Sequence, residues 1–417
     1  MDAATTRRRR MPWIIGLAAT LLMLIYGYAP MLHSALTRPT PVEAPDFPST
    51  IAPYSWYTSM LSSSRFDAAT LLYQNGVGVE FMDDPQSVLL SADGSTYRRL
   101  DEAEAASIAE DQGDPATTVL APDGTFVVIG SAGRTGQIQV VSLRDGQSRS
   151  VSVGSGRTGL PIAIGADGRT VLLATSDDVV DRYSEPLELG LARVDLQTGD
   201  VRDYPSVRGV LGAALAPDNS RIVVTTNGGA MIIDVASGRV VADLATTSEV
   251  RLDGDAWSAD GRRIAFVDDA SLVIVDTSGS TPTQERLPMT QGEYGTVLGW
   301  RDDSTVLVHA FTNGGENTSE LYWTDIRTGH QQSFSTYTPN FTGASLLGAD
   351  AARHLIPRWQ VADRPVDRGP RPFGVIVAPV IPAVLIGLLA VIFSRRVVRV
   401  TLPARSASAP AAMSSGR

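Results

Sequence analysis

The segment Trp257-Ser258-Ala259-Asp260-Gly261-Arg262-Arg263-Ile264-Ala265-Phe266 joins a tryptophan, an Asp-Gly pair and a run of strand-forming residues. Asp-Gly next to an apolar run is a hairpin signal, because glycine accepts a positive φ. Related phrases recur about every 45 residues, a period typical of repeat architectures. Such a period indicates one supersecondary unit copied along the chain, and four short strands fill that unit.

Each unit follows the same order. An apolar strand leads to the first turn and a second strand follows. After a loop, a third and a fourth strand are joined by a second turn, as at Asp145-Gly146 and Thr198-Gly199. We interpret the first-turn aspartates as turn formers rather than catalysts, because an Asp side chain bonds its own backbone two residues further on. These residues are Asp67, Asp123, Asp167, Asp218, Asp260, Asp302 and Asp350.

The turn positions divide the chain into six complete units and a shorter seventh one, residues 342–366. A four-stranded sheet cannot bury both of its faces alone, so neighbouring units must stack around a closed ring. The sequence therefore predicts an all-β propeller over residues 54–366. We expect seven blades; the alternative is six, with a strand from residues 51–60 closing the last unit.

The phrase at Trp257 resembles the WD40-like and TolB-type propeller repeat, whose hallmark is Trp-Ser-Pro-Asp-Gly before an apolar strand. This unit departs from the pattern by Ala259 in place of proline, and Trp300 keeps the tryptophan in the next unit. The resemblance covers the whole repeat region and implies a propeller fold there. It implies no particular activity, because such propellers serve many unrelated roles.

Charge is distributed unevenly along the 417 residues. Four arginines precede residue 11 and five follow residue 394, whereas all but one of the 45 acidic residues lie between them. The acidic middle repels phosphate, so we expect no nucleic-acid partner. The chain has no cysteine, which excludes disulfides and thiolate chemistry, and no lysine, which indicates a GC-rich bacterial genome.

Two long apolar segments flank the acidic middle. Residues 11–32 and 373–393 carry no charge, and each can cross a hydrocarbon core of roughly 30 Å. We predict two transmembrane helices; the alternative for the first is a cleaved signal peptide, because a basic stretch precedes it. The positive-inside rule places the basic tails 1–10 and 394–417 in the cytoplasm and the propeller outside the cell membrane.

Two linkers connect the predicted spans to the repeat region. Residues 33–53 contain prolines at positions 39, 41, 45, 48 and 53, a composition typical of an extended spacer. A shorter linker covers residues 367–372. We therefore expect a tether at each end of the ring.

The rim opposite the turns collects acidic and amide side chains. Loops after the second and fourth strands of a unit form that rim, and carboxylates that converge there would dock a basic partner or bind Ca²⁺. The alternative interpretation is solvated loop charge. No Asp-x-Asp-x-Asp loop is present, so we expect no metal and no cofactor. The candidates are Asp177, Asp178, Asp181, Asp268, Asp269, Asn313 and Glu316.

These features together favour a non-catalytic, membrane-tethered module that binds an envelope or membrane protein. No Gly-x-Ser-x-Gly elbow is present, which argues against a hydrolase of the prolyl-peptidase kind. The alternative is an envelope glycan-processing lyase or hydrolase, which would need two carboxylates with separated pKa values at the central channel. The sequence leaves the oligomeric state open.

Overall fold

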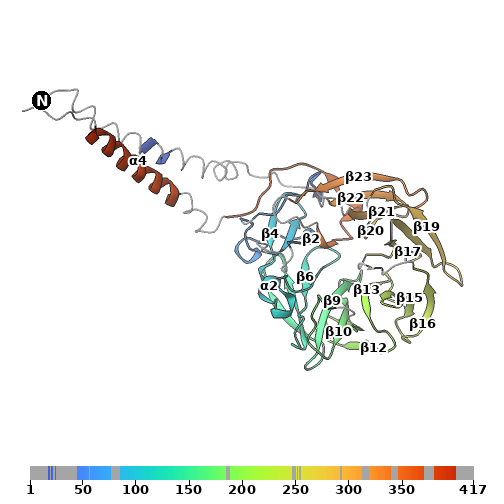
Figure 1. The fold of residues 1–417 in the computed structure, drawn as a ribbon. Coiled ribbons are helices and arrows are strands. Elements are labelled where there is room, and N and C mark those ends of the chain that lie inside the picture. Colours follow the sequence, from blue (N-terminus) through green and yellow to red (C-terminus); the bar gives the residue numbers. More distant parts are fainter. Residues whose placement is uncertain are drawn as a thin grey trace, which may run out of the picture. The chain divides into compact units, whose positions relative to one another are not determined.

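The chain forms two compact units, Pro39–Pro370 and a second one made of Met1–Arg38 with Arg371–Arg417. The first unit contains the repeats, and Figure 1 shows its sheets arranged around a ring. The computed structural model describes residues 17, 18, 20, 21, 24, 45–55, 57–76, 85–184, 188–246, 250, 252, 255–291, 294–311, 319–339, 346–370 and 380–400.

Four blades of the ring each consist of four consecutive antiparallel strands. Their order in each sheet follows the order in the chain, so the turns after the first and third strands share one rim. We number these sheets blades 2, 3, 4 and 6. They are β5–β8 (Thr118–Leu120, Phe126–Ile129, Gln137–Ser142, Ser148–Ser152), β9–β12 (Thr158–Ile164, Thr170–Ser176, Gly190–Asp195, Val201–Tyr204), β13–β16 (Val210–Leu215, Arg221–Thr226, Gly229–Asp234, Val240–Leu244) and β20–β23 (Tyr294–Asp302, Thr305–Phe311, Ser319–Asp325, Gln331–Tyr337).

Blade 5 explains why the repeated phrase contains tryptophan. Its strands are β17–β19 (Arg263–Asp268, Ser271–Asp276, Thr283–Pro288), and Trp257 takes the innermost position by bridging to Ile264. The indole Nε1 of Trp257 donates to the Ala214 carbonyl of blade 4 at 3.1 Å. Trp300 of blade 6 repeats the contact with the Ala256 carbonyl at 3.0 Å. Each buried indole thus joins the inner edge of its blade to the preceding one and satisfies its own N–H.

The described part of the ring contains six blades, so the expectation of seven was wrong. Blade 1 has the order β24-β2-β3-β4, in which β24 (Leu347–Ala351) comes from the end of the repeat region. The other strands are β2 (Ala69–Asn75), β3 (Gln86–Ser91) and β4 (Tyr97–Arg99). The short last unit therefore completes the first blade instead of starting a seventh. The pairing of β24 with β2 covers an edge of β2 that would otherwise be open to another chain.

The position of Asp350 also corrects a prediction. The residue lies inside β24 opposite Leu72 of β2, not in a turn. Its carboxylate accepts the Leu120 N–H of blade 2 at 2.6 Å. Asp350 therefore links two neighbouring blades at their inner edge.

Residues before the first blade strengthen the closure, although residues 51–60 do not supply the closing strand. β1 (Asp46–Phe47) pairs in parallel with β25 (Gln360–Val361), and Thr50 bridges to Thr336 at the edge of blade 6. Phe47 is fully buried, with its ring centroid 4.5 Å from that of Trp359. Part of the predicted linker 33–53 is thus folded into the ring.

Short helices lie in the connections of this unit. The segment between blades 1 and 2 holds α2 (Asp101–Ala105) and the 3-10 helix η2 (Ala109–Asp111). A second 3-10 helix, η1 (Leu61–Ser63), precedes β2, and η3 (Ile356–Arg358) follows β24. In the chain, η3 lies between β24 and β25, the two strands that close the ring.

The second unit contains α4 (Val380–Val400), which begins inside the predicted span 373–393. The Thr20 hydroxyl donates to the Ala383 carbonyl of α4 at 3.3 Å. Among the residues that the structure describes, none belongs to a helix with both the length and the apolar character to cross a membrane. The described residues do not include the predicted tail 1–10, most of the predicted span 11–32, residues 373–379 or residues 401–417.

Candidate functional site

The first turns of blades 2 to 6 share one hydrogen-bonding pattern. In each turn an aspartate Oδ1 accepts the backbone N–H of the second residue after it, at 2.8–3.0 Å. The Ser220 hydroxyl lowers the pKa of Asp218, and the Ser258 hydroxyl lowers the pKa of Asp260. These carboxylates hold their own turns, as an Asx-turn does. They are Asp123, Asp167, Asp218, Asp260 and Asp302.

The second turns of the blades have the same hydrogen-bonding pattern and lie on the same rim, which we call the turn rim. The Ser237 hydroxyl lowers the pKa of Asp234, and the Ser278 hydroxyl does the same for Asp276. Asp145, Asp195 and Asp325 also accept backbone N–H groups two residues further on. The turn rim is therefore lined by carboxylates whose orientation is fixed by hydrogen bonds.

The opposite rim does not gather the predicted acidic candidates into one site. Asp177 and Asp178 are exposed in the loop after β10, and Asp181 accepts the Tyr183 N–H at 3.0 Å. Asp268 is buried in blade 5 against Arg286, while Asp269 turns the chain with a φ of 53°. Asn313 and Glu316 lie outside the described residues. The described candidates are thus divided between blades 3 and 5.

A different group of charged side chains does meet on that rim. Arg182 in the loop after β10 lies 2.8 Å from the buried Asp111 in the connection between blades 1 and 2. Burial raises the pKa of Asp111, and the Ile108 N–H and Arg182 oppose that shift. The neighbouring Tyr183 hydroxyl donates to Asp114. These contacts fasten blade 3 to the start of blade 2, and each acid has a partner.

A second buried ion pair lies at the centre of the ring. Arg353 follows β24, yet its Nε lies 2.9 Å from Oδ1 of Asp255 in blade 5, and its Nη2 donates to the Ile164 carbonyl in blade 3. Because these groups come from three separate blades, Arg353 spans the central opening. Burial raises the pKa of Asp255 to about 6, and Arg353 opposes that shift.

The residues after Arg353 fill the same opening on the turn side. The His354 N–H donates to the Pro122 carbonyl of blade 2 at 2.9 Å. Ile356 lies so close to Gly299 of blade 6 that a Cβ at Gly299 would come within 2.5 Å of the Ile356 Cδ1. We call residues 353–358 the axial plug. The plug thus contacts blades 2, 3, 5 and 6 around the central opening.

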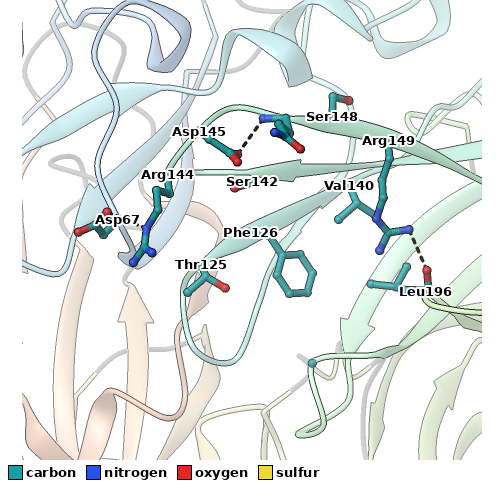
Figure 2. Close-up of a pocket in the computed structure, with 12 residues that line it drawn as sticks. Asp67, Thr125, Phe126, Val140, Ser142, Arg144, Asp145, Ser148, Arg149 and Leu196 are labelled. Atoms are coloured by element: carbon teal, nitrogen blue, oxygen red, sulfur yellow. Dashed lines mark hydrogen bonds and ion pairs between the residues drawn. The ribbon is translucent and has the colours of Figure 1, made fainter.

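Open grooves lie instead between neighbouring blades on the turn rim. One groove of about 510 Å³ lies between blades 2 and 3, with Phe126, Val140 and Leu196 among its apolar lining residues. Figure 2 shows Thr125 and Phe126 between Arg144 on one side and Arg149 on the other. Arg144 Nε pairs with Asp67 at 2.9 Å, and Arg149 Nη1 donates to the Leu196 carbonyl at 2.8 Å.

A second groove of about 590 Å³ lies between blades 4 and 5. It is lined by turn residues that include Asp218, Asp260 and Arg262. Arg221 crosses it to the Gly261 carbonyl at 3.0 Å and stacks over Trp257, with 5.0 Å between the guanidinium carbon and the ring centroid. Both grooves lie on the turn rim, but of the two only the first has an aromatic side chain in its lining.

The residues that the structure describes contain no cluster of metal ligands, and one of their histidines is buried. No group of three or more His, Asp or Glu side chains among them is placed to hold a metal ion. His309 lies buried in β21, and burial lowers its pKa to about 4. This histidine is therefore neutral at physiological pH.

The sequence alone did not identify the residues that meet at the centre of the ring or in the groove between blades 2 and 3. Asp255 stands two residues before Trp257, so its place at the inner edge follows from the repeat once the ring is known. Arg353 and Arg149 carry no such signal, because their partners come from other blades.

Comparisons with known proteins give no match to a protein-family model and none to a curated protein. Among solved structures, the chain is similar to a putative TolB from Agrobacterium tumefaciens (16% identity, 55% of this chain and 84% of that chain covered, TM-score 0.42). It is also similar to a chain of a nidogen/laminin complex (13%, 68% and 98%, 0.43) and of Kuenenia stuttgartiensis hydrazine synthase (18%, 62% and 78%, 0.39). The six-bladed ring and its repeated Asp turns give the chain the fold of a β-propeller.

Proposed function

We propose that this chain is a membrane-tethered propeller that serves as a non-catalytic protein-interaction module at the bacterial cell envelope. The observation that carries the proposal is the turn rim, where fixed, ionised side chains surround open grooves. Orientation without titration near neutral pH suits recognition of a partner surface. General acid–base catalysis needs a group that exchanges a proton near the working pH.

The proposed tether draws support from the side chains of the second unit. The described part of α4 exposes Ile381, Leu385 and Leu388 by more than half, which favours an apolar environment around the helix. Its small residues Ala383 and Gly387 are buried, and Thr20 bonds to the former. Small residues and a hydroxyl bond are typical contacts between membrane helices.

The arrangement of arginines supports the proposed orientation. Both predicted tails, 1–10 and 394–417, contain arginines beside an apolar segment, and the propeller lies between them. Under the positive-inside rule both tails remain in the cytoplasm and the propeller is extracytoplasmic. A reporter that is active only in the cytoplasm, fused at residue 200 of the otherwise intact chain, should show no activity. Activity of that fusion would contradict the orientation.

Asp255 favours a second candidate function, an envelope glycan-processing enzyme, because its raised pKa is a property of general acids. Such an enzyme places two carboxylates several ångströms apart around the sugar. The charged group beside Asp255 is the guanidinium of Arg353. We therefore favour the interaction module over the glycan-processing enzyme.

Crosslinking in intact membranes, followed by purification of the full-length chain, tests the proposed function. We expect one or more envelope or membrane proteins to be recovered reproducibly with the chain and to be absent from a strain that lacks it. A matched assay measures turnover of envelope glycans by the same preparation. Glycan turnover that is lost in Asp255→Asn, with no protein recovered by crosslinking, would replace the module with the enzyme.

A further inference from the structure

Two arginines, Arg144 and Arg149, and two aspartates, Asp67 and Asp145, line the groove between blades 2 and 3. Oδ1 of Asp145 accepts the Gln147 N–H at 3.0 Å, and Oδ1 of Asp67 accepts Nε of Arg144. Each guanidinium has five N–H donors. Within the described residues, Arg144 uses its Nε and Arg149 uses its Nη1, so further donors of both side chains remain for a ligand.

The two arginines stand on opposite sides of the groove. Figure 2 shows the Phe126 ring between them. Phe126 is half-buried, whereas Val140 and Leu196 are buried beneath the surface. A ligand that reaches both guanidinium groups must therefore cross an apolar floor.

We propose that this groove binds an extended segment of a partner protein that carries a carboxylate on each side of an apolar side chain. The proposal rests on the interaction role proposed above and assigns it a surface and a partner chemistry. Charge-assisted bonds from the two arginines would hold the carboxylates, and the floor would bury the side chain between them. The segment must be extended because its two acidic groups have to separate across Phe126.

A comparison with the groove between blades 4 and 5 explains why we assign the partner segment to the groove between blades 2 and 3. There Arg221 is held by a carbonyl and an indole ring, and Arg262 lies 3.9 Å from Asp260 with its side chain largely exposed. The apolar side chains in its lining are Pro217 and Ala259, whereas those of the first groove include Phe126 and Val140. The second groove thus provides a matched control on the same rim of the same protein.

The test uses full-length protein and the labelled synthetic peptide Gly-Glu-Ser-Leu-Ser-Glu-Gly, with binding followed by fluorescence anisotropy. We expect saturable binding that weakens as salt is raised, because exposed charge pairs are screened. Arg149→Ala should weaken binding by about tenfold, the effect of losing one charge-assisted bond. Arg262→Ala should leave the affinity unchanged. Two control peptides replace both Glu by Arg or replace Leu by Ser, and both should bind more weakly.

Several results would overturn the assignment: no binding of the acidic peptide, equal binding of the Arg-containing peptide, or equal losses in Arg149→Ala and Arg262→Ala. Thermal unfolding of each variant shows whether a loss of binding comes from a loss of fold. The crosslinking experiment separates this proposal from the wider one. If Arg149→Ala recovers the same partner in the same amount, the groove assignment fails while the interaction role stands.

Discussion

Aspartates on the turn rim and at the centre of the ring have opposite surroundings. Asp218 lies near solvent, and a serine hydroxyl and a backbone N–H lower its pKa. Asp255 is buried, its pKa is raised, and its charge depends on a single guanidinium from the end of the repeat region. The same side chain thus forms a local turn at one place and a contact across the ring at the other. The difference predicts very unequal effects of substitution.

The largest effect should follow from Arg353→Ala. This change leaves the Asp255 carboxylate buried without its partner and removes the donor to the Ile164 carbonyl. Removing one partner of a buried ion pair costs roughly 3–5 kcal/mol of unfolding free energy. Urea unfolding at neutral pH measures the loss. The double variant Asp255→Ala/Arg353→Ala should lose less than Arg353→Ala alone, and an equal or larger loss would contradict the pairing.

The pH dependence of stability should identify the buried carboxyl. The folded-state pKa of Asp255 is raised from 3.8 to about 6, so the folded chain holds a proton that the unfolded chain has released. The stabilisation from this proton is fully present below the unfolded pKa and is lost as pH rises through about 6. Between those limits the loss is about 3 kcal/mol, at 1.36 kcal/mol for each pKa unit.

Asp255→Asn provides the reference for this measurement, because an amide does not titrate. We expect the unfolding free energy of the natural protein, relative to that of the variant, to fall as the pH is raised from about 4 to about 7. Turn aspartates such as Asp218 and Asp260, whose pKa values are lowered, act in the opposite direction but are common to both proteins. A difference that does not change with pH would show that Asp255 keeps an ordinary pKa.

Local and distant contacts also determine how much could be predicted from the sequence. The turn aspartates Asp218 and Asp260 accept hydrogen bonds from residues only two positions away, so their phrases indicate these turns directly. The blade count depended on whether residues 347–351 start a blade or complete the first, and both choices use the same strand pattern. Pairing with β2, more than 270 residues away, decided it, and no local signal reports such a contact.

The candidate sites follow the same division. The acids of the opposite rim were identified by composition, but their partners, such as Arg286 for Asp268, depend on strand register. The axial plug depends on the exit of the chain from β24 into the centre of the ring. Its contacts with Pro122 and Ile164 join segments far apart in sequence. The repeat predicts the propeller architecture, but it does not predict the buried ion pairs.

A smaller effect is expected from Asp218→Ala on the turn rim. The change removes the acceptor for the N–H and the hydroxyl of Ser220, both of which lie near solvent and can bond to water instead. We expect a loss of about 1 kcal/mol in unfolding free energy, the net value of an ordinary intramolecular hydrogen bond. Asp218→Asn keeps an acceptor and should recover much of it. A loss as large as that of Arg353→Ala would erase the distinction between the two regions.

The smallest effect should come from Arg144→Ala at the edge of the groove. The side chains of Arg144 and Asp67 are 72% and 78% exposed, so water screens their ion pair. Exposed pairs of this kind contribute between zero and about 1 kcal/mol, and we expect the unfolding midpoint in urea to change little. If stability is unchanged while the acidic peptide binds more weakly, the side chain serves recognition. A large loss of stability with unchanged peptide binding would instead place Arg144 among the residues that hold blades 1 and 2 together.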